Sequence, residues 1–424
     1  MDTVMPATHN VPSAASRSDT DFDLVVIGAS YAGVGVIAAA REAGFAGRIA
    51  LVGDEADLPY QRPPLSKGFL LGKAGLASLP LKAESFYADA QVSFMAGRRA
   101  VALDRQTRRI SLDDGSELGF GTLALTTGAR AAALRCPGAE LDGVVSLRSL
   151  DEARALSQRL ATASAVVIIG GGFIGLEVAS AAVTLGKQVT VVEAGPRLIG
   201  HAVAPEISAF MQRLHEARGV TVKLATKVER IEGEAGRVTA VTCAEGSRLP
   251  CDLVLAAVGA VPNTELAAEA GLTVEDGIVV DDLCRSSDPA IFAAGDCTSH
   301  PNVFARRLMR LSSVQNAHDQ GRVAGNAIAG RLEPYKAVPW FWSDQYEVKL
   351  QMVGLASGSG PAILRGSMEE GRFSLFRYDG DRLTAIESIN RPADHMMGRR
   401  LIAAGLSPTP EQAGDPGFDL RSLA

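Results

Sequence analysis

The stretch Val166-Val-Ile-Ile-Gly170-Gly-Gly172-Phe-Ile-Gly175 joins an apolar run to a glycine turn, and a helical stretch follows it. The next apolar run ends at Glu193. A strand followed by GxGxxG and a helix points backbone N–H groups at a pyrophosphate, and an acid after the next strand accepts hydrogen bonds from ribose hydroxyls. The alternative is a buried glycine-rich turn that binds nothing. The full set of flanking elements favours a Rossmann-like dinucleotide-binding unit.

The same order of elements occurs earlier in the chain, beginning with Leu24-Val-Val-Ile-Gly28-Ala-Ser30-Tyr-Ala-Gly33. An Ala-rich helical stretch and an apolar run follow, and Asp54 takes the place of the acid. Ser30 replaces the middle glycine, but serine is small and its hydroxyl can donate to a phosphate. Each copy ends in an apolar strand and a glycine, at Gly128 and at Gly259. Landmarks that recur at a nearly constant offset predict two related nucleotide-binding units.

Two dinucleotide sites in one chain suggest two dinucleotides that exchange electrons. Nicotinamide and flavin are the natural pair, because a flavin takes a hydride and releases single electrons. We expect FAD at the first site and the nicotinamide coenzyme at the second. Glu193 favours NADH, because a 2′-phosphate would meet like charge there. Arg197 lies four residues further on and would partly offset that repulsion.

The pattern of apolar and polar residues changes after Pro334. Short alternating runs appear at 348–353 and 373–377, and Asp379-Gly380-Asp381 predicts a hairpin turn. A helix is expected after Pro392, through Ile402. The fold class predicted is therefore α/β, with two Rossmann-like dinucleotide-binding domains and a C-terminal α+β domain. The expected limits are a disordered leader at 1–20, a discontinuous FAD-binding domain at 21–126 and 256–335, an NAD-binding domain at 127–255, and a C-terminal interface domain at 336–424.

Composition narrows the class of protein. The 424 residues are 47% hydrophobic and 21% charged, the balance of a globular protein, and the net charge of −6 gives no reason to expect nucleic acid. The 17 uncharged residues from Leu24 to Ala40 resemble a short membrane span, but the acidic residues before them argue against a signal or membrane segment. We therefore expect no membrane partner.

Cysteine and histidine usage excludes further classes. Five cysteines rule out a disulfide-built scaffold and fit a reducing, cytoplasmic compartment. They form no CxxC or CxxxxC pair, which a flavin disulfide reductase would need, and no Fe–S cysteine set. Cys297 is the one cysteine expected near the cofactor, as a buried bystander. The six histidines show no metal-ligand spacing, so no metal is predicted.

Two further motifs bear on the flavin. Pro59-Tyr-Gln-Arg-Pro-Pro-Leu-Ser-Lys67 contains consecutive prolines, which predict an extended approach to Lys67. A cation there would stabilise negative charge on reduced flavin, although a solvated lysine is the ordinary alternative. The apolar stretch from Ser287 closes on Gly295-Asp296. Asp296 would accept a hydrogen bond from a ribityl hydroxyl, unless it is a plain turn aspartate.

These motifs resemble those of the FAD-dependent, NADH-using ferredoxin reductases that serve cytochrome P450 and Rieske-type oxygenases. The resemblance covers about residues 22–405. It rests on Tyr60-Gln-Arg-Pro-Pro-Leu-Ser-Lys67, Gly170-Gly-Gly-Phe-Ile-Gly-Leu-Glu177, Ala294-Gly-Asp296-Cys297 and Pro339-Trp-Phe-Trp-Ser-Asp-Gln-Tyr346. The last motif holds both tryptophans of a chain that has two. The resemblance implies a glutathione-reductase-like arrangement of the domains.

The resemblance also implies site residues. Lys67 would pair with Glu177 near the flavin, and Trp342 would lie beside the isoalloxazine. With the turn residues, the FAD contacts expected are Gly28, Ser30, Ala32, Gly33, Asp54, Lys67, Ala100, Thr127, Gly128, Arg148, Gly295, Asp296, Val314 and Trp342. The NAD contacts expected are Gly170, Gly172, Ile174, Gly175, Glu193 and Gly259.

The electron acceptor implied is a small [2Fe–2S] ferredoxin. Such ferredoxins are expected to be acidic, so an acidic reductase needs a local basic patch to bind one. The candidates are Arg306, Arg307 and Arg310, and then Arg399 and Arg400 in the C-terminal helix. The alternative is that these arginines are ordinary solvated residues.

Two other functions stay open on the sequence. One is a flavoprotein whose redox state changes its partners, like apoptosis-inducing factor. The other is a reductase of the monodehydroascorbate or quinone type, which would reduce small acceptors without a ferredoxin. Turnover distinguishes them, because a redox-gated binder should oxidise NADH slowly.

Overall fold

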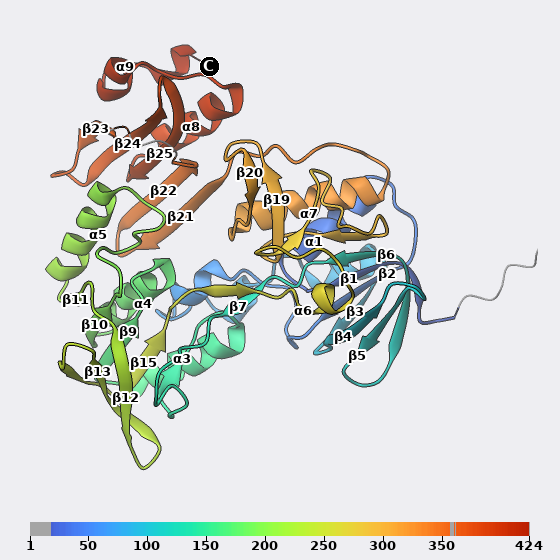
Figure 1. The fold of residues 1–424 in the computed structure, drawn as a ribbon, viewed down its shortest axis with the longest axis horizontal. Coiled ribbons are helices and arrows are strands. Elements are labelled where there is room, and N and C mark those ends of the chain that lie inside the picture. Colours follow the sequence, from blue (N-terminus) through green and yellow to red (C-terminus); the bar gives the residue numbers. More distant parts are fainter. Residues whose placement is uncertain (1–17, 357–359, 361, 424) are drawn as a thin grey trace, which may run out of the picture.

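The computed structural model describes residues 18–356, 360 and 362–423. The predicted leader at 1–20 therefore lies almost wholly outside the described residues. Figure 1 shows three lobes: the first domain, built from the blue and orange parts of the chain, a green second domain, and a red C-terminal domain. The predicted fold class is confirmed, with two α/β units and a C-terminal α+β unit.

The first domain is built on a seven-stranded sheet in the order β3-β2-β1-β6-β5-β4, with β18 paired to β6. The β1, β2, β3, β6 and β18 pairings are parallel, while β4 and β5 add antiparallel strands. β18 reaches this sheet from a point in the sequence beyond the second domain, so the first domain is discontinuous. The strands are β1 Asp21–Ile27, β2 Ile49–Gly53, β3 Val92–Ala96, β4 Ala100–Asp104, β5 Arg109–Leu112, β6 Glu117–Leu125 and β18 Ile291–Ala293.

Helices α1 and α7 pack against each other on this sheet at very short range. A Cβ at Gly321 would lie 2.5 Å from the Ala32 carbonyl oxygen, and one at Gly325 would lie 2.3 Å from that of Val36. Only glycine allows this approach. The remaining elements of the domain are α1 Tyr31–Glu42, η1 Pro63–Ser66, η2 Leu76–Ser78, α2 Glu84–Asp89, α6 Glu265–Glu269, β17 Ile278–Val279, β19 Thr298–Asn302, β20 Arg307–Met309 and α7 Val314–Ile328.

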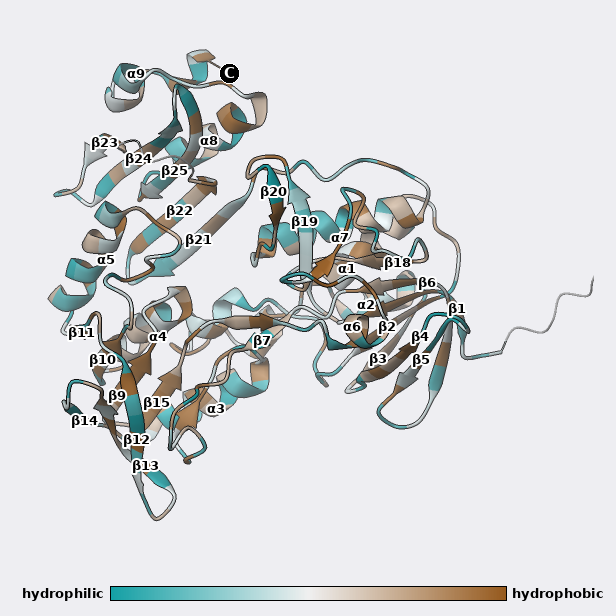
Figure 2. Ribbon diagram, viewed as in Figure 1, coloured by the Kyte–Doolittle hydropathy of each residue, from teal (hydrophilic) through white to brown (hydrophobic). Residues whose placement is uncertain are grey.

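The second domain has a parallel sheet in the order β11-β10-β9-β15-β8. Its central strands are buried on both faces, which explains their continuous apolar runs; Figure 2 shows them in brown. The elements are β8 Val144–Val145, α3 Leu150–Thr162, β9 Ala165–Ile169, α4 Phe173–Thr184, β10 Gln188–Val192, α5 Pro205–Ala217, β11 Thr221–Lys223, β12 Val228–Glu234, β13 Arg237–Cys243, β14 Arg248–Pro250 and β15 Leu253–Ala256.

The chain crosses between the two domains twice, and the crossings lie side by side. β7 (Ala129–Ala131) leads out of the first domain and pairs antiparallel with β16 (Ala260–Pro262), which leads back. The two glycine turns are thereby brought to the same region of the molecule.

The C-terminal domain is the predicted antiparallel sheet, in the order β21-β22-β25-β24-β23. The predicted hairpin turn at 379–381 joins β24 to β25, and the helix expected after Pro392 is α8. β21 and α4 of the second domain are in contact. The elements are β21 Trp340–Gln345, β22 Val348–Gly354, β23 Ile363–Ser367, β24 Arg372–Asp379, β25 Arg382–Ile389, α8 Pro392–Ala404, α9 Pro410–Gly414 and η3 Leu420–Leu423.

One local prediction is wrong. The consecutive prolines before Lys67 do not form an extended segment but the 3₁₀ turn η1. A proline φ near −65° suits a 3₁₀ turn as well as an extended chain, so the dipeptide alone does not distinguish them.

Candidate active site

A cavity of about 1730 Å³ lies where the three domains meet. Residues from both glycine turns, from η1 and from β21 line it. Pockets for single drug-sized ligands measure roughly 300–1,000 Å³, so this cavity has room for more than one. No three His, Cys, Asp or Glu side chains converge as metal ligands in the part of the chain that the structure describes.

The first glycine turn is built to hold its backbone close to the neighbouring strand. Gly28 has φ +110°, and a Cβ there would lie 2.1 Å from the Thr126 carbonyl oxygen. A Cβ at Gly33 would lie 2.2 Å from the Gly28 carbonyl oxygen. Ser30 is the N-cap of α1, makes no side-chain capping bond and lines the cavity. Its hydroxyl and the first N–H groups of α1 suit an anion.

The second glycine turn repeats this geometry. Gly170 has φ +110°, and its Cβ would lie 2.2 Å from the Ala257 carbonyl oxygen. A Cβ at Gly175 would lie 2.2 Å from the Gly170 carbonyl oxygen, whereas Gly172 faces open space within the cavity lining. The first and third glycines are thus needed for packing, and the second leaves room for a ligand. Both turns fit the pyrophosphate of a dinucleotide.

The acids at the ends of the second strands are held differently. Asp54 Oδ2 lies 3.2 Å from Arg99 Nη2, and both side chains are exposed. Glu193 Oε2 accepts from the Gly171 amide at 2.7 Å, and Oε1 accepts from the Gly195 amide at 2.6 Å. A carboxylate has about four acceptor positions, and these two bonds use two of them. Glu193 can therefore still accept hydrogen bonds from ribose hydroxyls.

Arg197 is anchored in the loop that follows Glu193 and lines the cavity. Its guanidinium donates to the carbonyl oxygens of Val203 at 2.7 Å and Gly200 at 2.5 Å, and to Ser208 Oγ at 2.9 Å. These bonds hold the loop before α5 and use three of the five guanidinium N–H groups, so a partial offset of the repulsion on a 2′-phosphate stays a prediction.

Lys67 and Glu177 form the expected ion pair. Lys67 Nζ lies 2.8 Å from Glu177 Oε2, and the two side chains are 19% and 3% exposed. Ser66 Oγ also donates to this carboxylate oxygen. Lys67 is therefore not the solvated lysine of the alternative interpretation, and the pairing implied by the resemblance is confirmed.

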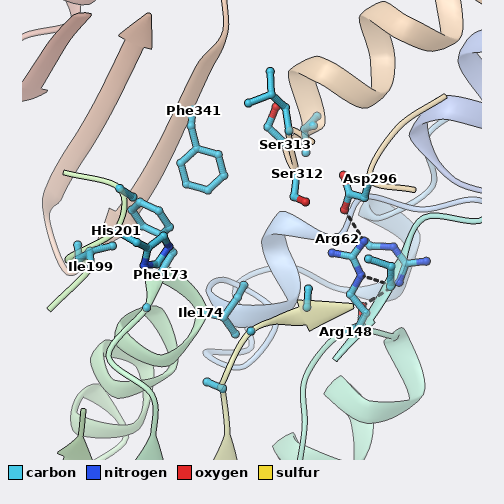
Figure 3. Close-up of a pocket in the computed structure, with 18 of the residues that line it drawn as sticks. Arg62, Arg148, Phe173, Ile174, Ile199, His201, Asp296, Ser312, Ser313 and Phe341 are labelled. Carbon is cyan, nitrogen blue, oxygen red and sulfur yellow. Dashed lines mark hydrogen bonds and ion pairs between the residues drawn. The ribbon is translucent and has the colours of Figure 1, made fainter. Parts of the chain in front are cut away.

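A second charged cluster lies beside α7 and β18 (Figure 3). Arg148 Nη2 lies 2.7 Å from Asp296 Oδ2, and Arg62 donates to the Arg148 carbonyl oxygen at 2.8 Å and to Glu55 at 2.8 Å. The Tyr60 hydroxyl also donates to Glu55. These contacts fix Arg62, which sequence reasoning did not select although it lies within a quoted motif.

Aromatic side chains line the cavity beside β21. The Phe173 and Phe341 rings lie 4.6 Å apart, and Figure 3 shows them at the side of the cavity opposite the Arg62 cluster. Trp342 lies 5.5 Å from Trp340, centroid to centroid. Phe173 follows the second glycine turn and Phe341 lies between the tryptophans. Both phenylalanines were missed, because each was read only as part of its motif.

Most of the predicted site residues meet in this one cavity. Three do not line it: Gly33 and Gly175 pack inside their turns, and Ala100 begins β4 at the edge of the sheet. The contact expected at Ala100 therefore gains no support and stays a prediction. Those that line the cavity are Gly28, Ser30, Ala32, Asp54, Lys67, Thr127, Gly128, Arg148, Gly170, Gly172, Ile174, Glu177, Glu193, Gly259, Gly295, Asp296, Val314 and Trp342.

The cysteines take no part in the site. Cys297 is fully buried, its Sγ lies 3.4 Å from the Ala294 carbonyl oxygen, and burial raises the pKa of its thiol. All five cysteines are free, and none lines the cavity among the described residues. Cys297 is thus the buried bystander that the sequence suggested.

Two of the five predicted docking arginines line the cavity. We call Arg306, Arg307 and Arg310 the β19–β20 arginines; the last two line the cavity, and Arg310 pairs with Asp276 at 3.2 Å. In α8, Arg399 lies over the Trp340 ring at 4.9 Å, and Arg400 is exposed. Arg307 and Arg310 therefore belong to the cavity lining, and Arg399 contacts Trp340, a residue of that lining.

The fold and the site define an oxidoreductase that uses FAD and NAD(H). Residues 22–321 match the family model described as pyridine nucleotide-disulphide oxidoreductase, and residues 340–424 match the one described as reductase C-terminal. The chain belongs to the pyridine nucleotide-disulphide oxidoreductase family. No helix among the described residues is long and apolar enough to cross a membrane.

Several relatives share nearly the whole chain. Rhodocoxin reductase of Rhodococcus erythropolis is 44% identical over 94% of this chain and 93% of its own. Putidaredoxin reductase of Pseudomonas putida is 38% identical over 95% and 96%. Among solved structures, a ferredoxin reductase of Rhodopseudomonas palustris is 44% identical with a TM-score of 0.92, covering 95% of this chain and 100% of that one. The covalent putidaredoxin reductase–putidaredoxin complex is 37% identical, also at 0.92, over 96% and 98%.

Proposed function

We propose that this protein passes electrons from NADH through FAD to a small [2Fe–2S] ferredoxin that serves a cytochrome P450 or Rieske-type oxygenase. The observation that carries the proposal is one cavity whose lining joins the two dinucleotide turns, the Lys67–Glu177 pair, Arg307 and Arg310. The names of the relatives support the acceptor, since they include rhodocoxin reductase and a putidaredoxin complex.

The first glycine turn, Asp54 and the Arg148–Asp296 pair would hold FAD. Bound FAD supplies a ring that accepts a hydride and releases electrons one at a time. The N-terminus of α1 binds the pyrophosphate, and Asp296 accepts from a ribityl hydroxyl. Lys67, fixed by Glu177, would add positive charge beside the flavin, and Trp342 would contact it from β21.

The second glycine turn and Glu193 would hold NADH. The N-terminus of α4 binds its pyrophosphate, and Glu193 accepts from the adenine ribose. Phe173 and Phe341, whose rings lie 4.6 Å apart, supply apolar surface to the same cavity. No side chain has to act as an acid or a base, because orientation and electrostatics suffice for hydride transfer between bound coenzymes.

The ferredoxin docks over the cavity mouth. The β19–β20 arginines supply positive charge, and the exposed side chains of Val303 and Leu308 add apolar surface in the same segment. Arg399 continues the basic surface onto α8, where it contacts Trp340. This mixture of arginine and apolar side chains suits a short-lived electron-transfer complex.

The same proposal keeps the domain limits at 21–126 with 256–335, at 127–255 and at 336–424. The crossing strands β7 and β16 support the two boundaries of the second domain. Five unpaired cysteines support a cytoplasmic location.

The proposal is tested by acceptor specificity. Purified enzyme loaded with FAD is assayed with NADH and, in turn, a [2Fe–2S] ferredoxin, a rubredoxin, a quinone and monodehydroascorbate. The highest kcat/KM should belong to the ferredoxin. A rubredoxin, quinone or monodehydroascorbate that is reduced more efficiently would show another acceptor class, and slow NADH oxidation with all four would favour a redox-gated binder.

A further inference from the structure

A chain of buried hydrogen bonds leads away from the Lys67–Glu177 pair into the junction of the three domains. Ser343 Oγ donates to Glu177 Oε1 at 2.6 Å, and Gln345 Nε2 donates to Ser343 Oγ at 3.0 Å. His215 Nε2 lies 2.7 Å from Gln345 Oε1. The four side chains from Glu177 to His215 are each at most 3% exposed.

The donor and the acceptor of each hydrogen bond in this series can be assigned by starting from the Glu177 carboxylate. A carboxylate only accepts, so Ser343 donates to Glu177 and must accept from the Gln345 amide nitrogen. The Gln345 oxygen then faces His215, whose Nε2 carries the hydrogen. Burial lowers the pKa of His215 and keeps the ring neutral, so Nδ1 is free to accept from the Tyr346 hydroxyl 3.3 Å away.

The chain ties together elements of all three domains. Lys67 follows η1, Glu177 and His215 lie on α4 and α5, and Ser343 and Gln345 lie on β21. A backbone bond secures the register of β21 against α4, since the Tyr346 amide donates to Ser180 Oγ at 2.8 Å. Ser343 and Trp342 are neighbours on one strand, so they point to opposite faces of it.

We propose that Ser343, Gln345 and His215 are positioning residues for electron transfer, which act through Glu177 on Lys67. Each donor points its positive end along the chain toward Glu177, and the dipoles of an ordered chain reinforce one another. The carboxylate is thereby held in the one orientation that keeps Lys67 at the flavin edge. This inference rests on the proposed function, because Lys67 matters to the reaction only if flavin lies beside it. A purely structural role, as a bond between domains, is the competing explanation.

The test compares variants in the FAD-loaded enzyme by two readouts, the midpoint potential of bound FAD and the rate of its anaerobic reduction by NADH. Ser343→Ala and Gln345→Leu interrupt the chain, and Ser343→Thr restores the hydroxyl. Ser388→Ala is the matched control, since it removes a buried hydroxyl of the same sheet that hydrogen bonds to Ser374 at 2.9 Å and does not line the cavity. Lys67→Met shows in which direction the midpoint potential of bound FAD changes when the cation is removed.

The two interrupting variants should lower the midpoint potential in the same direction as Lys67→Met but by less, because positive charge at the flavin edge is weakened and not lost. The reduction rate should fall about twofold to fivefold, less than in Lys67→Met, with the KM for NADH changed less than twofold. Ser343→Thr and the control should match wild type.

One result would refute the positioning role of Ser343, Gln345 and His215, and a second would refute the position of Lys67 beside the flavin. Unchanged potential and rate in both interrupting variants, with a lowered unfolding midpoint, would leave the chain a structural bond and refute the proposal. Unchanged potential in Lys67→Met would refute the flavin-edge position of Lys67 itself, and the positioning role with it.

Discussion

The preference for NADH that we propose depends mainly on the carboxylate of Glu193, and Glu193→Ala tests it. Glu193 is fixed by the Gly171 and Gly195 amides, and three donors of the Arg197 guanidinium bond to its own loop. The carboxylate should therefore repel the 2′-phosphate of NADPH, with Arg197 as a partial offset. Wild type should prefer NADH, and removing the carboxylate should narrow the preference.

The magnitude follows from the charges. Two unit charges about 5 Å apart interact by roughly 3 kcal/mol at an effective dielectric constant of about 20. Glu193 is half-buried, and salt screens it, so about 2 kcal/mol is a fair value, or roughly 30-fold in kcat/KM. The substitution also frees the two glycine amides, so activity with both coenzymes should fall while their ratio shifts toward NADPH.

The assay measures kcat/KM for NADH and NADPH with ferricyanide as the acceptor. Glu234→Ala is the control, because Glu234 is an exposed acid at the far end of β12 in the same domain. The control should keep the wild-type ratio. A wild type that prefers NADPH, or a Glu193→Ala enzyme with an unchanged ratio, would refute the reasoning.

Three other predictions concern the flavin edge, the docking surface and acid stability. Lys67→Met should slow flavin reduction by NADH roughly tenfold in stopped flow, because the charge on reduced flavin loses a stabilising cation; an unchanged rate would contradict this. Charge reversal of the β19–β20 arginines should raise the KM for ferredoxin at least about tenfold at low salt and spare ferricyanide reduction, and roughly half-molar salt should slow the wild type in the same selective way. Equal ferredoxin reduction by the triple variant would place docking elsewhere. Burial lowers the pKa of His300 to about 4, below its unfolded value of 6.5, so its contribution to stability, about 3 kcal/mol, is present above pH 6.5 and lost as pH falls toward 4. Urea unfolding across that range should show a shallower loss for His300→Gln, and parallel curves would contradict it.

The fold could be predicted because its decisive signals are local. Gly28 and Gly170 both need φ +110° and a position where a Cβ would strike the next strand, so no other residue can replace them. Alternating runs and a turn of Asp-Gly-Asp likewise determine β24 and β25 from neighbouring residues alone. The repeat of the whole motif then made the two-domain arrangement evident.

The contacts of the site could not be predicted in the same way, because they join residues far apart in sequence. Arg62 pairs with Glu55, Phe341 packs against Phe173, and His215 hydrogen bonds to Gln345. No local pattern in the sequence predicts any of these three contacts. The Lys67–Glu177 pair was anticipated only through a family resemblance. The conformation of the two prolines was also undetermined, because their φ suits two backbone geometries.

The central claim is that NADH electrons leave this flavoprotein singly, to a [2Fe–2S] ferredoxin. It is tested most directly by anaerobic stopped flow, in which enzyme reduced with one equivalent of NADH is mixed with an excess of oxidised ferredoxin, and the flavin and cluster absorbances are followed together. The account predicts two ferredoxins reduced per NADH, at a rate on the order of tens per second. A flavin that stays reduced in the presence of ferredoxin, and is reoxidised only when a quinone is added, would contradict it.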